Sequence, residues 1–186
     1  MNNPRLISVV GLQNSGKTRA VNALVKCWVQ QGLRVGVVKH DGHLQPGQSD
    51  DWEKPESDTE QFTASGASYT LLTGGGRTLL RAAADPDAAD PEALCRRTAE
   101  LAERQGQPLD IVVVEGFKRS DLPKVAVLRD ESHVKWVNQA ELTGLFAVIA
   151  PAAVSHLVAV DARVYDENRV DSLCFDFWHN DPKVRR

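Results

Sequence analysis

The segment GLQNSGKT, residues 11–18, constrains the fold more than any other part of this sequence. It matches the pattern G-x-x-x-x-G-K-[ST], whose glycines let the backbone turn its N–H groups toward phosphate oxygens. An apolar run, RLISVV (5–10), precedes the segment, and Val21, Leu24 and Trp28 follow it at the spacing of one helix face. A strand, a glycine-rich loop and a helix in this order predict a phosphate-binding loop at the start of an α/β fold.

The rest of the chain continues this alternation of apolar and amphipathic segments. Continuous apolar strands separated by helices are typical of a mostly parallel sheet covered by helices on both faces. We therefore predict an α/β fold of the P-loop NTPase class, as a single nucleotide-binding domain over residues 1–186 with a frayed tail, HNDPKVRR. Further strands are expected at 33–40, 109–116, 124–130, 145–150 and within 156–166, and helices from Lys17 to Gly32, over about 90–105 and over 168–179.

The middle of the chain has a different composition. Residues 41–58 are rich in Gly, Pro, Asp and Ser, which predicts a long loop, and long loops of this kind are often functional. A short helix is expected over 59–67 and an extended segment over 68–73, followed by a glycine turn. The segment RTLLRAAA (77–84) is compatible with either a strand or a helix.

Composition argues against several classes of protein. The 186 residues carry a net charge of −3, which disfavours broad electrostatic binding of nucleic acid. No apolar run approaches the ~18 residues of a membrane span, and the first residues lack the pattern of a secretory signal. Cys27, Cys95 and Cys174 are widely spaced, which predicts buried free thiols in a reducing compartment. We therefore expect a cytoplasmic protein that binds neither nucleic acid nor membrane.

Each part of the loop has a chemical role. Gly11 and Gly16 permit a tight backbone turn, and the helix that follows points free N–H groups and its positive dipole end at the anion. Lys17 is expected to bridge the β- and γ-phosphates, and the Thr18 hydroxyl to bind Mg²⁺. The other loop residues that we assign to the nucleotide are Asn14, Ser15 and Arg19.

An acidic residue that completes a magnesium site is expected at the end of a neighbouring strand. The segment DIVVVEG (110–116) offers Asp110 and Glu115, which strand steps of ~3.3 Å place about 16 Å apart. Ligands of such sheets lie at the carboxyl ends of the strands. Glu115 is therefore the predicted Mg²⁺ ligand, whereas Asp110 is expected to begin or cap the strand.

Polar residues also follow the second predicted strand, at the same end of the sheet. Lys39, His40 and His43 lie there. His40 and His43, together with Asp50 and Asp51, would also suit a transition metal, although no zinc-like spacing is complete. A polar loop that faces the nucleotide is the favoured interpretation.

Four segments together resemble a known family. They are GLQNSGKT (11–18), KHDGH (39–43), DWEKPESDTEQFTASGA (51–67) and VVVEGFKRSDLPKVAVLRD (112–130). Their order and spacing resemble the molybdopterin-guanine dinucleotide biosynthesis protein B family (MobB). The resemblance implies a cytoplasmic, homodimeric adapter that binds GTP and Mg²⁺, hydrolyses GTP slowly and assists the guanylyltransferase that joins GMP to molybdopterin. Direct contact with molybdopterin is left open.

The resemblance also implies residue roles by position. Lys39, His40 and His43 would line the nucleotide-facing loop, and Gly116 and Lys118 belong to the family's Glu-Gly-Phe-Lys motif. The residues implied in catalysis are Lys17, Asp58 and Glu115, and those implied in Mg²⁺ binding are Thr18, Asp58 and Glu115.

The sequence departs from the family pattern near Asp58. Family members commonly read Pro-Gly-Lys-Asp-Ser where this chain has PESDT (55–59), and a common arginine is replaced by Thr63. Two cations of the family pattern are therefore missing here. The Asn-Lys-x-Asp guanine reader of Ras-like GTPases is also absent, so a preference for guanine rests on the resemblance alone.

Two other function classes stay open. A small-molecule kinase would use the same loop but needs a lid that brings arginines over the phosphates. Arg77 and Arg81 are candidates for such a lid, whereas the arginines between residues 96 and 104 fit the solvated face of a helix. A nucleotide-dependent metal-insertion chaperone would instead use His40 and His43.

Overall fold

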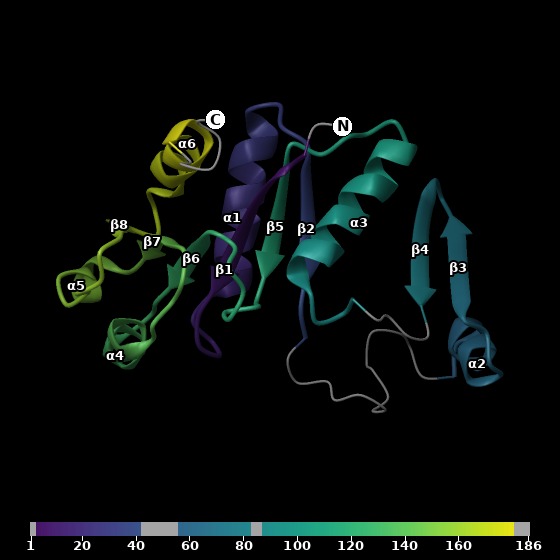
Figure 1. Ribbon diagram of the computed structural model, residues 1–186, viewed down its shortest axis with the longest axis horizontal. Coiled ribbons are helices and arrows are strands. Elements are labelled where there is room, and N and C mark those ends of the chain that lie inside the picture. The colour runs from purple at the N-terminus through teal and green to yellow at the C-terminus, as the bar shows by residue number, and fades with distance from the viewer. Residues whose placement is uncertain (1–2, 42–55, 83–86, 181–186) are drawn as a thin grey trace. The chain divides into compact units, whose positions relative to one another are not determined.

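The computed structural model describes residues 3–41, 56–82 and 87–180. The chain divides into two compact units, one made of residues 1–40 and 91–186 and the other of residues 41–90 (Figure 1). The end of the predicted frayed tail and most of the predicted loop over 41–58 lie outside the described residues. A single domain over the whole chain stays a prediction, and the phosphate-binding loop lies wholly within the first unit.

The first unit is built on a six-stranded parallel sheet with the strand order β2-β5-β1-β6-β7-β8. This confirms the predicted α/β fold with a parallel sheet. The strands are β1 (Arg5–Val10), β2 (Val35–Lys39), β5 (Ile111–Glu115), β6 (Lys124–Val127), β7 (Leu145–Ile149) and β8 (Arg163–Tyr165). The helices are α1 (Lys17–Gln30), α3 (Pro91–Arg104), α4 (Glu131–Gln139), α5 (Ala152–Ser155) and α6 (Val170–Asn180).

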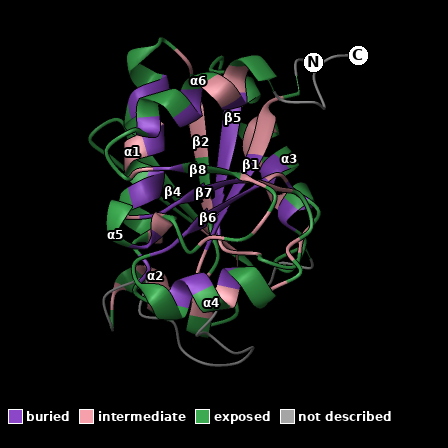
Figure 2. Ribbon diagram, turned by 90° about the vertical axis from the view of Figure 1, so that its left-hand side faces the viewer, coloured by how far each residue is buried: buried purple, intermediate pink, exposed green. Residues whose placement is uncertain are grey.

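Helices cover both faces of this sheet, because alternate residues of each strand point to opposite sides. On one side, Ile7 belongs to a core cluster with Trp28 of α1 and Phe177 of α6. On the other side, separate clusters join Val112 to α3 and Val148 to α4. Figure 2 shows the buried strands of this sheet between the helices. The sheet is therefore the central layer that continuous apolar strands require.

Helix α4 was not predicted, and β6 is shorter than predicted. The strand expected over 124–130 ends at Val127. Asp130 then caps α4 by accepting hydrogen bonds from the backbone N–H groups of Ser132 and His133. An aspartate just before a helix is a strong N-cap signal. The prediction missed it because the apolar run KVAVL was extended through the cap.

Other elements fall close to their predicted positions. The ambiguous segment 77–84 contains a strand, β4 (Arg77–Ala82). The extended segment expected within 156–166 forms only the short β8, and the helix expected over 168–179 is α6. All three cysteines are free and buried, as predicted.

The second unit contains a helix and a β-hairpin. Helix α2 (Asp58–Ala64) follows Ser57, whose hydroxyl accepts a hydrogen bond from the Glu60 N–H group at 3.3 Å. Strands β3 (Tyr69–Gly74) and β4 pair antiparallel across Gly75 and Gly76. The positive φ angles of these two glycines, 57° and 73°, suit a two-residue hairpin turn. The predicted short helix, extended segment and glycine turn are therefore present.

Candidate functional site

The loop between β1 and α1 is folded tightly by its own small residues. A Cβ atom on Gly11 would lie 2.5 Å from the Ser15 Oγ atom and 2.7 Å from the Val127 carbonyl oxygen, so only glycine fits there. Asn14 and Gly16 have left-handed backbones, with φ angles of 60° and 95°. Gly16 is the N-cap of α1, so the free N–H groups of the first helical turn begin at the loop. This is the backbone arrangement that binds phosphate.

The side chain of Ser15 supports the same interpretation. Ser15 is 5% exposed, and its hydroxyl has no hydrogen-bond partner within the described part of the chain. Buried hydroxyls are normally paired, because an unpaired one costs about 1–3 kcal/mol. A phosphate oxygen on the loop would supply the missing partner. The residues present therefore fit a phosphate group.

Lys17 contacts the loop backbone and lies near other charged residues. Its Nζ atom donates a hydrogen bond to the Leu12 carbonyl oxygen at 2.8 Å. Burial lowers the pKa of Lys17, while nearby Glu115 raises it and nearby Lys118 and Lys39 lower it. Three ammonium groups and one carboxylate therefore share the space beside the loop. Positive charge is in excess at the place where an anion would bind.

Thr18 and Glu115 form the contact on which the magnesium prediction depends. The Thr18 hydroxyl donates to the Glu115 carboxylate, at 3.0 Å from Oε1 and 3.1 Å from Oε2. Glu115 is 8% exposed and is the last residue of β5, paired in register with Val9 of β1 and Lys39 of β2. Hydroxyl and carboxylate oxygens are the ligand types that Mg²⁺ takes. These two side chains therefore fit the metal of a magnesium nucleotide.

Some residues considered for the site are not placed at this edge of the sheet by the described structure of the first unit. Asp110 lies immediately before β5, where its Oδ2 atom accepts a hydrogen bond from the Arg34 N–H group at 2.8 Å, as expected for a residue that begins or caps the strand. His43 lies outside the described residues, as do Asp50 and Asp51. Asp58 is the first residue of α2, in the second unit. Its roles in catalysis and Mg²⁺ binding stay predictions.

The residues that follow β2 and β5 pack against each other near Glu115. The His40 N–H group donates to the Glu115 carbonyl oxygen at 3.1 Å, and the ring centroids of His40 and Phe117 lie 4.5 Å apart. Gly116 has a φ angle of 109°, and a Cβ atom there would lie 3.3 Å from the His40 Cβ atom. Lys39 and His40, at the start of the KHDGH segment, therefore meet the EGFK segment at one place. The described contact of the His40 ring is with Phe117.

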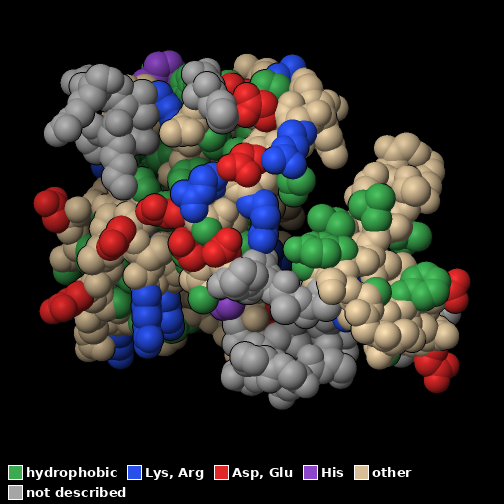
Figure 3. Space-filling model, turned by 45° about the vertical axis from the view of Figure 1, so that its right-hand side comes forward, with side chains coloured by type: hydrophobic (Ala, Val, Ile, Leu, Met, Phe, Trp, Pro, Cys, Tyr) green, Lys and Arg blue, Asp and Glu red, His purple; other side chains and the backbone are tan. Residues whose placement is uncertain are grey.

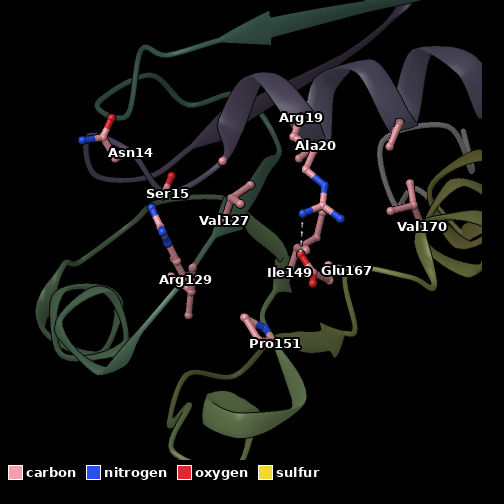
Figure 4. A pocket seen from close by; sticks show the side chains of 13 residues that line it. Asn14, Ser15, Arg19, Ala20, Val127, Arg129, Ile149, Pro151, Glu167 and Val170 are labelled. Atoms are coloured by element: carbon pink, nitrogen blue, oxygen red, sulfur yellow. Dashed lines mark ion pairs between the residues drawn. The ribbon is translucent and has the colours of Figure 1, made fainter.

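A pocket of about 400 Å³ opens beside the loop. It lies between α1, the residues that follow β6 and β7, and the segment that leads into α6 (Figure 4). Arg19, Arg129 and Glu167 are its charged lining residues, and the Arg19 Nη1 atom lies 3.3 Å from the Glu167 Oε2 atom. Figure 4 shows the Arg129 side chain extending toward the loop at Ser15.

Of the charged residues in this pocket, sequence reasoning assigned Arg19 to the nucleotide but missed Arg129 and Glu167. Both follow the carboxyl end of a strand, since β6 ends at Val127 and β8 at Tyr165. The rule that selected Glu115 would have selected these residues as well. Sequence reasoning applied this rule only to choose the predicted Mg²⁺ ligand, Glu115.

Comparison with known proteins decides the family. A family model described as molybdopterin guanine dinucleotide synthesis protein B (MobB) matches residues 6–151. The chain belongs to the MobB family. All four segments whose order and spacing first suggested this family lie within the matched range.

Individual MobB proteins agree with this assignment. A Bacillus subtilis protein named probable molybdopterin-guanine dinucleotide biosynthesis adapter protein is 32% identical over 130 residues, which are 70% of this chain and 68% of that protein. The crystal structure of a MobB protein homolog from Bacillus stearothermophilus is 26% identical, with a TM-score of 0.57 over 93% of this chain and 94% of that one. Bacillus subtilis MobB shares the fold, with a TM-score of 0.66 at 24% identity over 92% and 96% of the two chains.

The MobB match covers only part of the candidate site. It includes the loop, Glu115 and Arg129, whereas Glu167 lies beyond its last residue. Within the described residues, no helix is long and apolar enough to cross a membrane.

Proposed function

We propose that this chain is a cytoplasmic adapter that binds GTP with Mg²⁺ and assists a guanylyltransferase in joining GMP to molybdopterin. The proposal of Mg²⁺-dependent nucleotide binding rests on the contact between Thr18 and Glu115 beside the loop. Membership of the MobB family supports a role in molybdopterin guanine dinucleotide synthesis. The three buried free thiols suit a reducing compartment.

Different residues in and beside the loop would bind different parts of a triphosphate. Backbone N–H groups at the start of α1 and the hydroxyl of Ser15 would bind phosphate oxygens, and the Lys17 ammonium group, which lies beside the loop, would contact the phosphates. Thr18 and Glu115 hold the metal through their oxygens. When bound, Mg²⁺ neutralises part of the phosphate charge.

We propose that hydrolysis is slow, and the position of Glu115 supports this. Its carboxylate oxygens both contact the Thr18 hydroxyl, and its side chain is almost fully buried. A carboxylate held in this way suits metal binding better than activation of a water molecule, because a general base must reach the proton that it removes. We therefore propose that Glu115 supports binding and turnover through the metal. A nucleotide held for a long time suits an adapter, whose contact with a partner depends on the nucleotide state.

Calorimetric titration with GTP and ATP, each with and without Mg²⁺, tests the nucleotide proposal. We expect Mg²⁺-dependent binding of GTP at least about tenfold tighter than that of ATP, a difference of about 1.4 kcal/mol. The adapter role further predicts that immobilised chain retains purified guanylyltransferase more strongly with GTP and Mg²⁺ than without nucleotide. A preference for ATP together with rapid phosphorylation of an added small molecule would instead identify a kinase.

We also propose that the chain forms a homodimer through the β-hairpin of its second unit. Leu71 pairs with Leu80 and Leu72 with Leu79, so one leucine pair lies on each face of the hairpin. These side chains are 49–61% exposed, and hydrophobic side chains gather on the surface of this unit, at the right of Figure 3. A two-stranded hairpin is marginally stable alone, and an apolar face on it needs a cover. A second copy presents the same apolar face, as a two-fold interface requires.

Replacing Leu72 with aspartate should convert the dimer to a monomer. A charge buried in an apolar interface is expected to weaken association at least about thirtyfold, which corresponds to about 2 kcal/mol. Analytical ultracentrifugation over a range of concentrations measures the change. Leu101→Asp, which changes an exposed leucine on α3 in the first unit, is the matched control and should leave the dimer intact. A wild-type chain that is monomeric at high concentration would contradict the proposal.

A further inference from the structure

We propose that Glu167 selects guanine, with its carboxylate accepting hydrogen bonds from the N1–H and 2-amino groups of a base seated in the pocket beside the loop. This inference rests on the proposed binding of a nucleoside triphosphate at the loop, and it adds the residue that distinguishes the base. The family match ends before Glu167, so its role follows from this structure and not from the family pattern.

The position of the pocket makes it a continuation of the phosphate site. Asn14, Ser15 and Gly16 belong both to the loop and to the pocket lining. From there the pocket runs along α1 past Arg19 and Ala20 (Figure 4). A ligand whose phosphates lie on the loop therefore has its nucleoside directed into this space. The volume of about 400 Å³ falls within the range of small-molecule sites, about 300–1,000 Å³.

Part of the pocket lining is apolar and suits the faces of a flat ring. Ala20 and Ala23 of α1 lie on one side, and Val127 and Ile149 lie at the carboxyl ends of β6 and β7. Val170, at the start of α6, also lines the pocket. Apolar walls with a few polar groups that fix orientation are typical of small-molecule sites.

The carboxylate of Glu167 gives the pocket a preference for guanine. Glu167 supplies a carboxylate, and Arg19 holds it through the ion pair at 3.3 Å, which keeps the carboxylate at the pocket (Figure 4). Guanine has two adjacent donors, N1–H and the 2-amino group, and a carboxylate has two acceptor oxygens that match them. Adenine has an unprotonated N1 at the same position, so a carboxylate there would face a lone pair.

A purely structural role for the same ion pair makes a different prediction. Arg19 belongs to α1 and Glu167 precedes α6, and both residues are substantially exposed, at 76% and 42% of their side chains. Exposed pairs of this kind contribute little to stability. If Glu167 only tied the two helices together, its replacement would change the affinities for all nucleotides alike. If Glu167 reads the base, the ratios between nucleotides must change.

The variant Glu167→Gln separates the two roles, because glutamine keeps the shape and exchanges one acceptor for a donor. Its amide oxygen still accepts from N1–H, while its amide NH₂ opposes the 2-amino group of guanine and matches the O2 atom of xanthine. We expect GTP affinity to fall at least about tenfold, XTP affinity to rise at least about tenfold, and ATP affinity to stay within about threefold. In the wild type, ITP, which lacks the 2-amino group, should bind at least about tenfold more weakly than GTP.

Calorimetric titration of GTP, ITP, XTP and ATP in the presence of Mg²⁺ measures these ratios. Glu141→Gln, which changes an exposed carboxylate outside the pocket lining, is the matched control and should reproduce the wild-type values. An unchanged ratio of GTP to XTP affinity in Glu167→Gln would overturn the role of Glu167 while leaving the proposed function intact. A wild-type chain that binds none of the four nucleotides would contradict the proposed function itself.

Discussion

Replacing Lys17 with alanine should reduce GTP affinity at least about 100-fold, which corresponds to about 2.7 kcal/mol, and should leave the chain folded. The ammonium group stands beside the loop with Lys39 and Lys118 and is the cation that contacts the loop backbone directly. Hydrogen bonds to charged groups are worth about 1.5–3 kcal/mol each. A triphosphate takes more than one such bond from this lysine, so the loss is large.

The Lys17→Ala substitution should not destabilise the folded state. Burial lowers the pKa of Lys17, so the folded chain without nucleotide disfavours the charged form that predominates at neutral pH. A lowered lysine pKa means that stability rises as pH increases from the folded pKa toward the unfolded one. Removing the ammonium at pH 7 therefore removes an unfavourable charge.

Calorimetry for GTP binding and thermal unfolding for stability test this prediction together. Lys26→Ala is the matched control, because Lys26 lies on the same helix, is exposed and does not touch the loop. A Lys17→Ala chain that binds GTP within about threefold of the wild type would show that the phosphates lie elsewhere.

Replacing Glu115 with glutamine should abolish the Mg²⁺ dependence of GTP binding and lower GTP hydrolysis at least about 100-fold. In the wild type the Thr18 hydroxyl donates to Glu115 Oε1 at 3.0 Å, and the amide oxygen of glutamine can accept the same hydrogen bond, so the local structure is preserved. The substitution removes the negative charge that would attract the metal ion. GTP binding without Mg²⁺ should be kept or improved, because a buried carboxylate no longer repels the phosphates.

The strand β5 provides its own control for this variant. Asp110→Asn changes a carboxylate at the other end of the same strand, where the group accepts from the Arg34 N–H group. It should leave the response to Mg²⁺ unchanged. Titrations with and without Mg²⁺, followed by measurement of phosphate release, distinguish the two variants. Unchanged Mg²⁺-dependent hydrolysis in Glu115→Gln would remove Glu115 from the metal site.

Local sequence signals were sufficient for the core of the fold. The pattern GLQNSGKT and the apolar strands around it correctly predicted a parallel α/β sheet and its glycine-rich loop. The choice of Glu115 over Asp110 also needed only the direction of one strand, because a carboxylate at its carboxyl end must lie at the ligand-binding edge. Helix α4 was missed because its cap, Asp130, directly follows an apolar run that was extended too far.

The sequence by itself therefore determined the local geometry of the proposed phosphate-binding loop, because the residues from Gly11 to Arg19 are neighbours in the chain. Tertiary structure decided the rest. Thr18 meets Glu115 only because β5 pairs in parallel with β1, which sets Glu115 beside Val9. Glu167 meets Arg19 only because β8 and the start of α6 return to α1. Such contacts depend on strand order and register, which no short segment of sequence encodes.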